Sequence, residues 1–159
     1  MNVSTFYDIA SITSGVIESV ENNCVRIYLA PEDPHEIYAP ISGVITKIEA
    51  IQGEFKEQVF ESWTKKTGRL SVTVNGSVEV SFWIEVGEGY ITDTVKFERK
   101  LEEKVAKGEL IGKIEVGSLA QMCVPKDSNI KVKQGERLIG GKTTVAVVKD
   151  KKIIVPLLE

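Results

Sequence analysis

The chain has 159 residues, of which 20 are basic and 23 acidic, with 42% hydrophobic and 7% aromatic residues. This length suits one domain with a sizeable core, so we expect a single domain over residues 1–159. A net charge of -3 provides no broad basic face, and the few scattered aromatic residues provide no stacking platform for bases. Both observations argue against nucleic-acid binding.

The sequence also suggests where the protein works. No apolar run approaches the roughly 20 residues that span a bilayer as a helix, and no secretory signal or obvious transit peptide is evident. Cys24 and Cys123 are far apart and form no metal-spaced pair, so we expect buried, reduced thiols in a cytoplasmic protein. Two isolated cysteines and one histidine cannot form a zinc site of the usual type, and we expect no metal.

A repeated segment organises the N-terminal part of the chain. Residues 13–21 read TSGVIESVE, and residues 41–49 read ISGVITKIE. In each copy a Ser-Gly turn precedes residues that alternate between two faces, which is typical of a β-strand. The repeat therefore predicts two similar strands.

The only histidine, His35, lies between the two copies. An apolar, strand-like run ends at Pro31, a turn with Asp33 and Pro34 follows, and a turn at Pro40 restarts a strand. An unperturbed imidazole titrates near neutral pH, and loops at strand ends often hold functional groups. His35 is therefore a candidate proton donor or acceptor, and the alternative is a surface histidine without a task.

More strands are predicted further along the chain. Residues 70–74 and 78–84 are rich in strand-forming residues and meet around Asn75-Gly76, which predicts a β-hairpin. Residues 52–66 are polar and predict one irregular turn. Residues 96–105 have apolar side chains at helical spacing, which predicts a short amphipathic helix or a charged excursion between strands.

A second near-repeat relates residues 105–113, VAKGELIGK, to residues 132–140, VKQGERLIG. Gly108 and Gly135 would permit tight turns in these copies. Short strands that recur with glycine turns predict a mainly β fold, a sandwich or barrel with at most one or two short helices. The duplications resemble the barrel-sandwich hybrid of lipoyl and biotinyl carrier domains. The carriers' lysine-bearing hairpin sequence is missing, so a swinging-arm carrier is rejected.

Two glycine-containing segments could carry chemistry. Residues 135–143, GERLIGGKT, look like a phosphate-binding loop, but the lysine is one residue too far from the first glycine and a strand is expected to follow. We therefore reject that interpretation. The second segment is Gly117-Ser118, between two apolar strands. A serine so placed can attack the preceding carbonyl, shift the acyl group to oxygen and eliminate to leave an N-terminal pyruvoyl group, although Gly-Ser alone is most often a turn.

Two parts of the chain together resemble the phosphatidylserine decarboxylase family. Residues 27–45 with Gly53-Glu-Phe55 are similar to that family's Ser-Pro-x-Asp-x-His, Ala-Pro-x-x-Gly-x-Val and Gly-x-Phe pattern. Residues 107–118 and 132–140 look like its Lys-Gly-x-x-x-Gly and Gly-Ser block and its closing strands. The order and spacing fit the short, soluble type of the family over most of residues 10–147.

The resemblance implies a self-processing, pyruvoyl-dependent decarboxylase. Cleavage after Gly117 would make Ser118 the precursor of the pyruvoyl group, which is the expected cofactor. Its ketone would condense with the amine of phosphatidylserine, or of a related serine head group, and accept electrons while carbon dioxide leaves. His35 would donate or accept the proton, and Asp33 would help to orient the loop. The expected partner is then a phospholipid head group or membrane surface, with peripheral attachment.

The chain departs from the family pattern in three places. Ser14-Gly15 stands where the family has Asp-Gly, Tyr38 stands where a basic residue commonly lies, and no arginine pair is evident near residues 90–95. A neutral group cannot orient an imidazole as a carboxylate does, which is expected to cost orders of magnitude in rate. Three interpretations stay open: an active decarboxylase, a non-processing homologue that binds a lipid head group or a protein, and a structural or assembly protein. Exposed β edges would also allow a homodimer.

Overall fold

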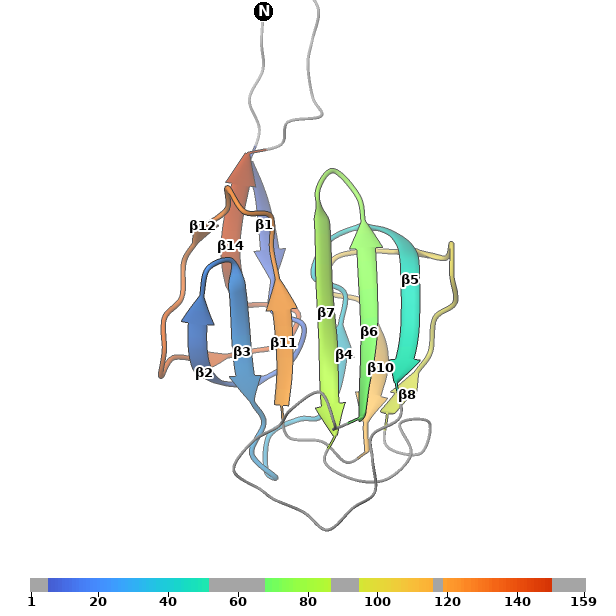
Figure 1. Ribbon diagram of the computed structural model, residues 1–159, viewed down its shortest axis with the longest axis horizontal. Coiled ribbons are helices and arrows are strands. Elements are labelled where there is room, and N and C mark those ends of the chain that lie inside the picture. The colour runs from blue at the N-terminus through green and yellow to red at the C-terminus, as the bar shows by residue number, and fades with distance from the viewer. Residues whose placement is uncertain (1–5, 52–67, 87–94, 116–118, 150–159) are drawn as a thin grey trace, which may run out of the picture.

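The fold consists of strands in the part of the chain that the computed structural model describes, residues 6–51, 68–86, 95–115 and 119–149 (Figure 1). These ranges contain fourteen strands and no helix, which confirms the predicted, mainly β fold. The strands are β1 (Phe6–Ala10), β2 (Gly15–Glu21), β3 (Cys24–Tyr28), β4 (Glu36–Tyr38), β5 (Gly43–Ile51), β6 (Gly68–Asn75), β7 (Glu79–Val86), β8 (Val95–Phe97), β9 (Lys104–Val105), β10 (Leu110–Ile114), β11 (Leu119–Cys123), β12 (Asn129–Ile130), β13 (Arg137–Leu138) and β14 (Thr144–Lys149).

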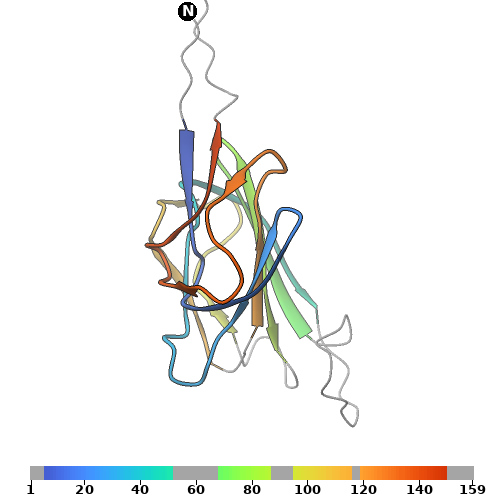
Figure 2. The ribbon, with the colours of Figure 1, turned by 90° about the vertical axis from the view of Figure 1, so that its left-hand side faces the viewer.

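The described strands form three sheets in two layers. One layer is an eight-stranded sheet in the order β13-β2-β3-β11-β7-β6-β5-β9. The other layer holds two three-stranded sheets, in the orders β1-β14-β12 and β4-β10-β8. These small sheets lie behind opposite halves of the large sheet in Figure 1, and Figure 2 shows the two layers from the side.

The hydrophobic core lies between the layers. On β3, Val25 and Ile27 are fully buried, whereas Cys24 and Arg26 are partly exposed and Tyr28 is exposed. This alternation is expected because successive side chains of a strand point to opposite faces. The largest fully buried side chains are Phe82, Ile9, Ile12, Ile17, Ile27, Leu29, Ile37, Ile41, Ile45, Ile84, Ile111 and Met122.

The strand order contains an internal two-fold repeat. Outward from the centre of the large sheet, β11, β3, β2 and β13 on one side match β7, β6, β5 and β9 on the other. The small sheets match in the same way, with β14 between β1 and β12, and β10 between β4 and β8. The second half, β4 to β10, is therefore inserted into the first half between β3 and β11.

The repeated segment of the sequence begins equivalent strands in the two halves. Gly15 begins β2 and Gly43 begins β5. A Cβ added at these glycines would lie 2.4 Å and 2.6 Å from a carbonyl oxygen of the neighbouring strand, so neither position has room for a side chain. The register of each strand then shifts, after Ile17 in β2 and after Ile45 in β5. The prediction of two similar strands is confirmed.

Four tight turns of the same type are bonded to β2, to β5 or to the segments just before them. In each turn the third residue has a positive φ, and its N–H donates to a carbonyl of a neighbouring segment at 2.7–2.9 Å. Such a conformation suits glycine, which has no Cβ to clash. The third residues, with their acceptors, are Glu102 with Ile45, Gly108 with Ala39, Gly135 with Ile17, and Gly141 with Ser11. The turns predicted at Gly108 and Gly135 are confirmed.

Cys24 and Cys123 form a disulfide, so the expectation of two reduced thiols is wrong. The two cysteines are 99 residues apart in sequence, but they occupy opposed positions on the neighbouring strands β3 and β11. Their spacing could not reveal this because the whole second half of the fold lies between them. Both are partly exposed rather than buried. The argument from reduced thiols to a cytoplasmic location therefore no longer holds.

The described residues test two further predictions, the hairpin around Asn75-Gly76 and the structure of residues 96–105. The hairpin around Asn75-Gly76 is confirmed, because β6 and β7 pair with Asn75 opposite Glu79. Residues 96–105 contain no helix: the end of β8 and the strand β9 flank a charged connection, so the alternative of a charged excursion is confirmed. The turn predicted at residues 52–66 lies outside the described residues.

Among the described residues, no helix is long and apolar enough to cross a membrane. The large sheet ends in β13 and β9, which have two residues each. Short edge strands offer little backbone for pairing with another chain. The homodimer stays a prediction.

Candidate functional site

The connection between β3 and β4 carries two of the candidate residues, Asp33 and His35. A tight turn forms its first part: the N–H of Asp33 donates to the carbonyl of Ala30 at 2.9 Å. The N–H of Ala30 donates in return to Oδ2 of Asp33 at 2.8 Å. Pro31 occupies the second position of this turn, where the fixed φ of proline is favourable. A local proline turn, closed by one carboxylate oxygen, thus shapes the loop.

The second carboxylate oxygen of Asp33 pairs with a distant residue. Nη1 of Arg137, on β13, donates to Oδ1 of Asp33 at 2.7 Å, and the Asp33 side chain is 5% exposed. Burial raises the pKa of Asp33, but the hydrogen bond from Ala30 and the ion pair with Arg137 outweigh it and hold the pKa below its usual value. Asp33 is therefore ionised at neutral pH, and both of its oxygens hold the loop.

His35 follows Asp33 and is partly buried. Its carbonyl accepts a hydrogen bond from the N–H of Ile114, the last residue of β10, at 2.8 Å. Its imidazole has no hydrogen-bond partner among the residues that the structure describes. A hydrogen bond to β10 thus fixes the backbone that carries the His35 ring.

Gly117 and Ser118 lie outside the described residues, but the chain on both sides of them is placed. On one side, Ile114 is bonded to His35. On the other side, Leu119 begins β11 and pairs with Tyr28, the last residue of β3. The stretch from the end of β3 to His35 therefore contacts the chain before and after Gly117-Ser118, at the end of the sheet where β3 ends and β11 begins (Figure 1).

Ser14 has a structural hydrogen bond at the position where the family has aspartate. Its hydroxyl is buried and accepts a hydrogen bond from the N–H of Gly140 at 2.9 Å. The equivalent serine of the second half, Ser42, accepts from the N–H of Lys107 at 2.9 Å. This symmetry indicates that Ser14 holds a turn onto the start of β2 rather than orienting an imidazole.

Tyr38 is also held by structural contacts. Its hydroxyl donates to Oε1 of Glu36 at 2.6 Å, and a Cβ on Gly140 would lie 2.8 Å from its ring. The hydrogen bond to Glu36, together with burial, raises the pKa of Tyr38 above its usual value. Tyr38 is therefore protonated at neutral pH and is a poor proton acceptor. The missing arginine pair concerns residues that are mostly outside the described ranges.

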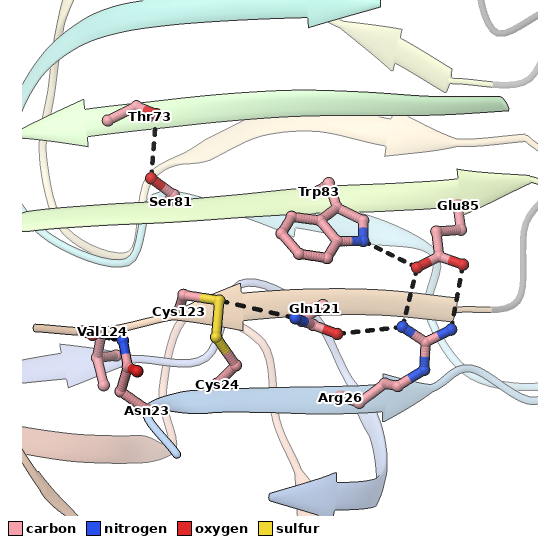
Figure 3. Close-up of a disulfide and its surroundings, with 10 residues drawn as sticks. All are labelled: Asn23, Cys24, Arg26, Thr73, Ser81, Trp83, Glu85, Gln121, Cys123 and Val124. Carbon is pink, nitrogen blue, oxygen red and sulfur yellow. Dashed lines mark hydrogen bonds and ion pairs between the residues drawn. A yellow bond between two sulfur atoms is a disulfide. The ribbon is translucent and has the colours of Figure 1, made fainter. Parts of the chain in front are cut away.

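A second polar cluster, which sequence reasoning missed, lies on the outer face of the large sheet (Figure 3). Arg26 contacts both carboxylate oxygens of Glu85, with Nη1–Oε2 at 2.9 Å and Nη2–Oε1 at 3.1 Å. Trp83 donates to Glu85 at 2.8 Å, and Arg26 donates to Gln121 at 3.1 Å. The cluster thus joins β3, β11 and β7 close to Leu119, which pairs with Glu85 in register.

The ion pair of Arg26 with Glu85 is shielded from solvent, because the Glu85 side chain is only 5% exposed. Burial alone would lower the pKa of Arg26, but the hydrogen bond and charge of Glu85, with a further contribution from Glu18, raise it above its usual value. The available signal in the sequence was the placement of single charged residues within apolar strands. Which of them meet depends on strand order, and the sequence alone does not show that order.

The described residues contain no group of three or more histidine, cysteine, aspartate or glutamate side chains that could hold a metal ion.

Known proteins match the chain along most of its length. A family model described as phosphatidylserine decarboxylase matches residues 4–146. The chain is 31% identical over 148 residues to an archaetidylserine decarboxylase proenzyme of Methanocaldococcus jannaschii, covering 92% of this chain and 71% of that relative. It is 27% identical over 122 residues to a phosphatidylserine decarboxylase proenzyme of Saccharopolyspora erythraea, covering 77% of this chain and 52% of the relative. A third relative, from Ehrlichia chaffeensis and of the same name, is 26% identical over 144 residues, covering 90% and 64%.

These relatives are longer than the match, and the chain spans between 52% and 71% of their own length. The family match nevertheless includes the loop of His35, the Gly117-Ser118 peptide and the strands that frame them. The chain belongs to the phosphatidylserine decarboxylase family.

Proposed function

We propose that this protein removes carbon dioxide from the serine head group of a phospholipid, after cleaving its own chain between Gly117 and Ser118. The family and the names of the relatives support a phosphatidylserine or archaetidylserine substrate. One observation carries the proposal for this chain. The stretch from the end of β3 to His35 is hydrogen-bonded to Ile114 before the cleavage peptide and pairs in register with Leu119 after it.

The residues around that peptide suit a pyruvoyl group. The His35 imidazole is unbonded among the described residues and lies on backbone that is fixed to Ile114. A pyruvoyl group made from Ser118 would supply the electron-withdrawing carbonyl that makes loss of carbon dioxide feasible. The protein itself would bind the head group, orient it and move protons.

His35 is the residue that we expect to move the proton. Loss of carbon dioxide leaves an electron pair on the α-carbon of the substrate, which must then take up a proton. An imidazole is a common proton donor in such a step. Asp33 does not share this role because Ala30 and Arg137 already occupy its oxygens, and it acts as a positioning residue for the loop.

Self-cleavage is expected to be slow in this chain. Ser14 is bonded to Gly140 and Tyr38 to Glu36, and they stand where the family pattern has a carboxylate and, commonly, a basic residue. A missing orienting carboxylate typically costs orders of magnitude in rate. We therefore expect maturation over hours or days rather than during synthesis.

The proposed substrate is part of a bilayer, so we also propose that the protein acts at a membrane surface as a peripheral protein. Binding of the purified protein to vesicles with and without phosphatidylserine would test this point. Equal binding to both kinds of vesicle would contradict recognition of the serine head group.

The intact mass of the protein, measured over several days after reduction and denaturation, tests self-processing. We expect the 17.5 kDa species to be replaced by two fragments, residues 1–117 and 118–159, the smaller one blocked to Edman degradation. The Ser118→Ala variant is the matched control and should stay intact. A wild-type chain that stays whole would contradict the proposal. It would favour the alternative of a non-processing homologue that acts as a binding module.

A further inference from the structure

The proposed cleavage peptide lies between the two cysteines of the disulfide in the sequence. Cys24 belongs to β3 and Cys123 to β11, and Gly117-Ser118 precedes β11. Cleavage there would place the two cysteines in different chains. We propose that the Cys24–Cys123 disulfide is the covalent link between the two chains of the mature protein, an inference that rests on the proposed self-cleavage.

The strands after the cleavage point are interleaved with those before it. β11 pairs on one side with β3 and on the other with β7. β13 pairs with β2, and β14 pairs with β1. Within the smaller fragment, the described pairing is that of β12 with β14, over two residue pairs. The smaller fragment therefore completes the first half of the fold and keeps only this short strand pair after separation, too little for independent stability.

Polar contacts cross the same boundary close to the disulfide. Asn23 donates across it to the carbonyl of Val124 (Figure 3). Within the smaller fragment, Gln121 donates to Sγ of Cys123 at 3.7 Å. One register step further along, Arg26 donates to Gln121 at 3.1 Å. The disulfide is thus embedded in a row of contacts that hold β11 on β3.

A covalent link at this point changes how the mature protein responds to unfolding. Without the link, the fragments would have to find each other again by diffusion, and refolding would depend on protein concentration. With the link, the second fragment stays close to the first at all dilutions. The mature protein should therefore refold in a concentration-independent way until a reductant is added.

Mass analysis of the mature protein with and without reductant tests the inference. Free thiols are alkylated first, and the protein is then denatured. We expect one species close to 17.5 kDa without dithiothreitol and two separate fragments with it. Fragments that separate without reductant would overturn the link while leaving self-processing intact. A single species under both conditions would overturn self-processing, and with it the two-chain form.

A chemical cleavage tests the bond itself in a chain that cannot process. Cyanogen bromide cleaves after methionine, and Met122 separates Cys24 from Cys123 in the Ser118→Ala variant. The fragments on either side of Met122 should stay joined without reductant and separate with it. The same variant with Cys24→Ser and Cys123→Ser is the control and should separate in both cases. Separation of the Ser118→Ala fragments without reductant would overturn the inference whether or not the wild type processes.

Discussion

Asp33 shows how one buried carboxylate fixes the conformation of a functional loop. One oxygen closes the turn with the N–H of Ala30, and the other holds Arg137 from the C-terminal part of the chain. The ion pair is formed with a guanidinium that is 56% exposed, whereas the carboxylate is buried. The backbone hydrogen bond and the burial of Asp33 therefore matter more for the loop than the charge pair alone.

The Asp33→Asn substitution should lower the free energy of unfolding by an amount that depends on pH. The folded pKa of Asp33 lies below its usual value, so its stabilisation is present above about pH 4 and is lost as the pH falls through the folded pKa. The free energy of unfolding in urea should be lower for Asp33→Asn than for wild type at pH 6, and the difference should shrink below pH 4. Glu32→Gln, at the exposed neighbouring position, is the control. A difference that is the same at pH 6 and pH 3 would contradict this role.

The His35→Ala variant should separate activity from stability. The imidazole makes no hydrogen bond to the described residues, so its removal should change the free energy of unfolding by less than about 0.5 kcal/mol. Loss of a proton-transferring group typically lowers the rate by about 10²- to 10⁴-fold. Release of carbon dioxide from serine-labelled lipid, with processing followed separately by mass, would measure this. Full decarboxylation by processed His35→Ala protein would show that another residue moves the proton.

The four tight turns connect strands of the large sheet to strands of the two small sheets. Three of them use a glutamate at the fourth position, whose carboxylate accepts the N–H of the first residue at 2.8–3.1 Å. The fourth uses Thr143 for the same purpose. Since each turn also exchanges backbone hydrogen bonds with a neighbouring segment, the turns fix where strands begin rather than merely linking them.

Substitutions at the third position of these turns should change the free energy of unfolding in opposite directions, depending on the residue replaced. Gly135→Ala should lower the free energy of unfolding by about 1–2 kcal/mol, because φ is 91° and no atom lies within 4 Å of an added Cβ. Gly141→Ala should cost more, since its Cβ would also lie 3.0 Å from the Tyr38 ring. Glu102→Gly should raise stability by about 0.5 kcal/mol, because relief at φ 71° exceeds the entropy cost of glycine. Urea unfolding of the three variants would measure this order, and equal effects at positions 135 and 141 would contradict it.

At the scale of the whole molecule, one half of the fold interrupts the other. The strands β4 to β10 are inserted between β3 and β11, and the proposed cleavage peptide lies where the chain returns to the first half. Cleavage at that point leaves every strand pair of the described sheets in place, because the break falls between strands. A chain cut there can therefore keep its fold.

Removal of the disulfide should destabilise the unprocessed protein. In the Ser118→Ala background, Cys24→Ser with Cys123→Ser should lower the free energy of unfolding by about 2–4 kcal/mol, because the bond closes a loop of about 100 residues in the unfolded chain. Urea unfolding at two protein concentrations would measure the loss, and the single-chain background should show no concentration dependence. An unchanged stability would indicate that the bond does not constrain the unfolded chain.

Local features of the fold could be predicted because they depend on neighbouring residues. The hairpin at Asn75-Gly76 and the turns at Gly108 and Gly135 follow from residues that favour those backbone conformations. The repeat at residues 13–21 and 41–49 correctly indicated a duplicated strand with a glycine start. The proposed roles of His35, Asp33 and Gly117-Ser118 came from a resemblance and remain predictions.

The amino-acid sequence by itself determined the class of fold, the family and the candidate residues, since these depend on local patterns and motifs. The tertiary structure alone decided the contacts between distant segments: the Cys24–Cys123 bond, the ion pair of Asp33 with Arg137, and the Arg26–Glu85 cluster. Each of these depends on which strands become neighbours. That choice is made by burying the apolar faces of all strands together, and no local spacing in the chain encodes it.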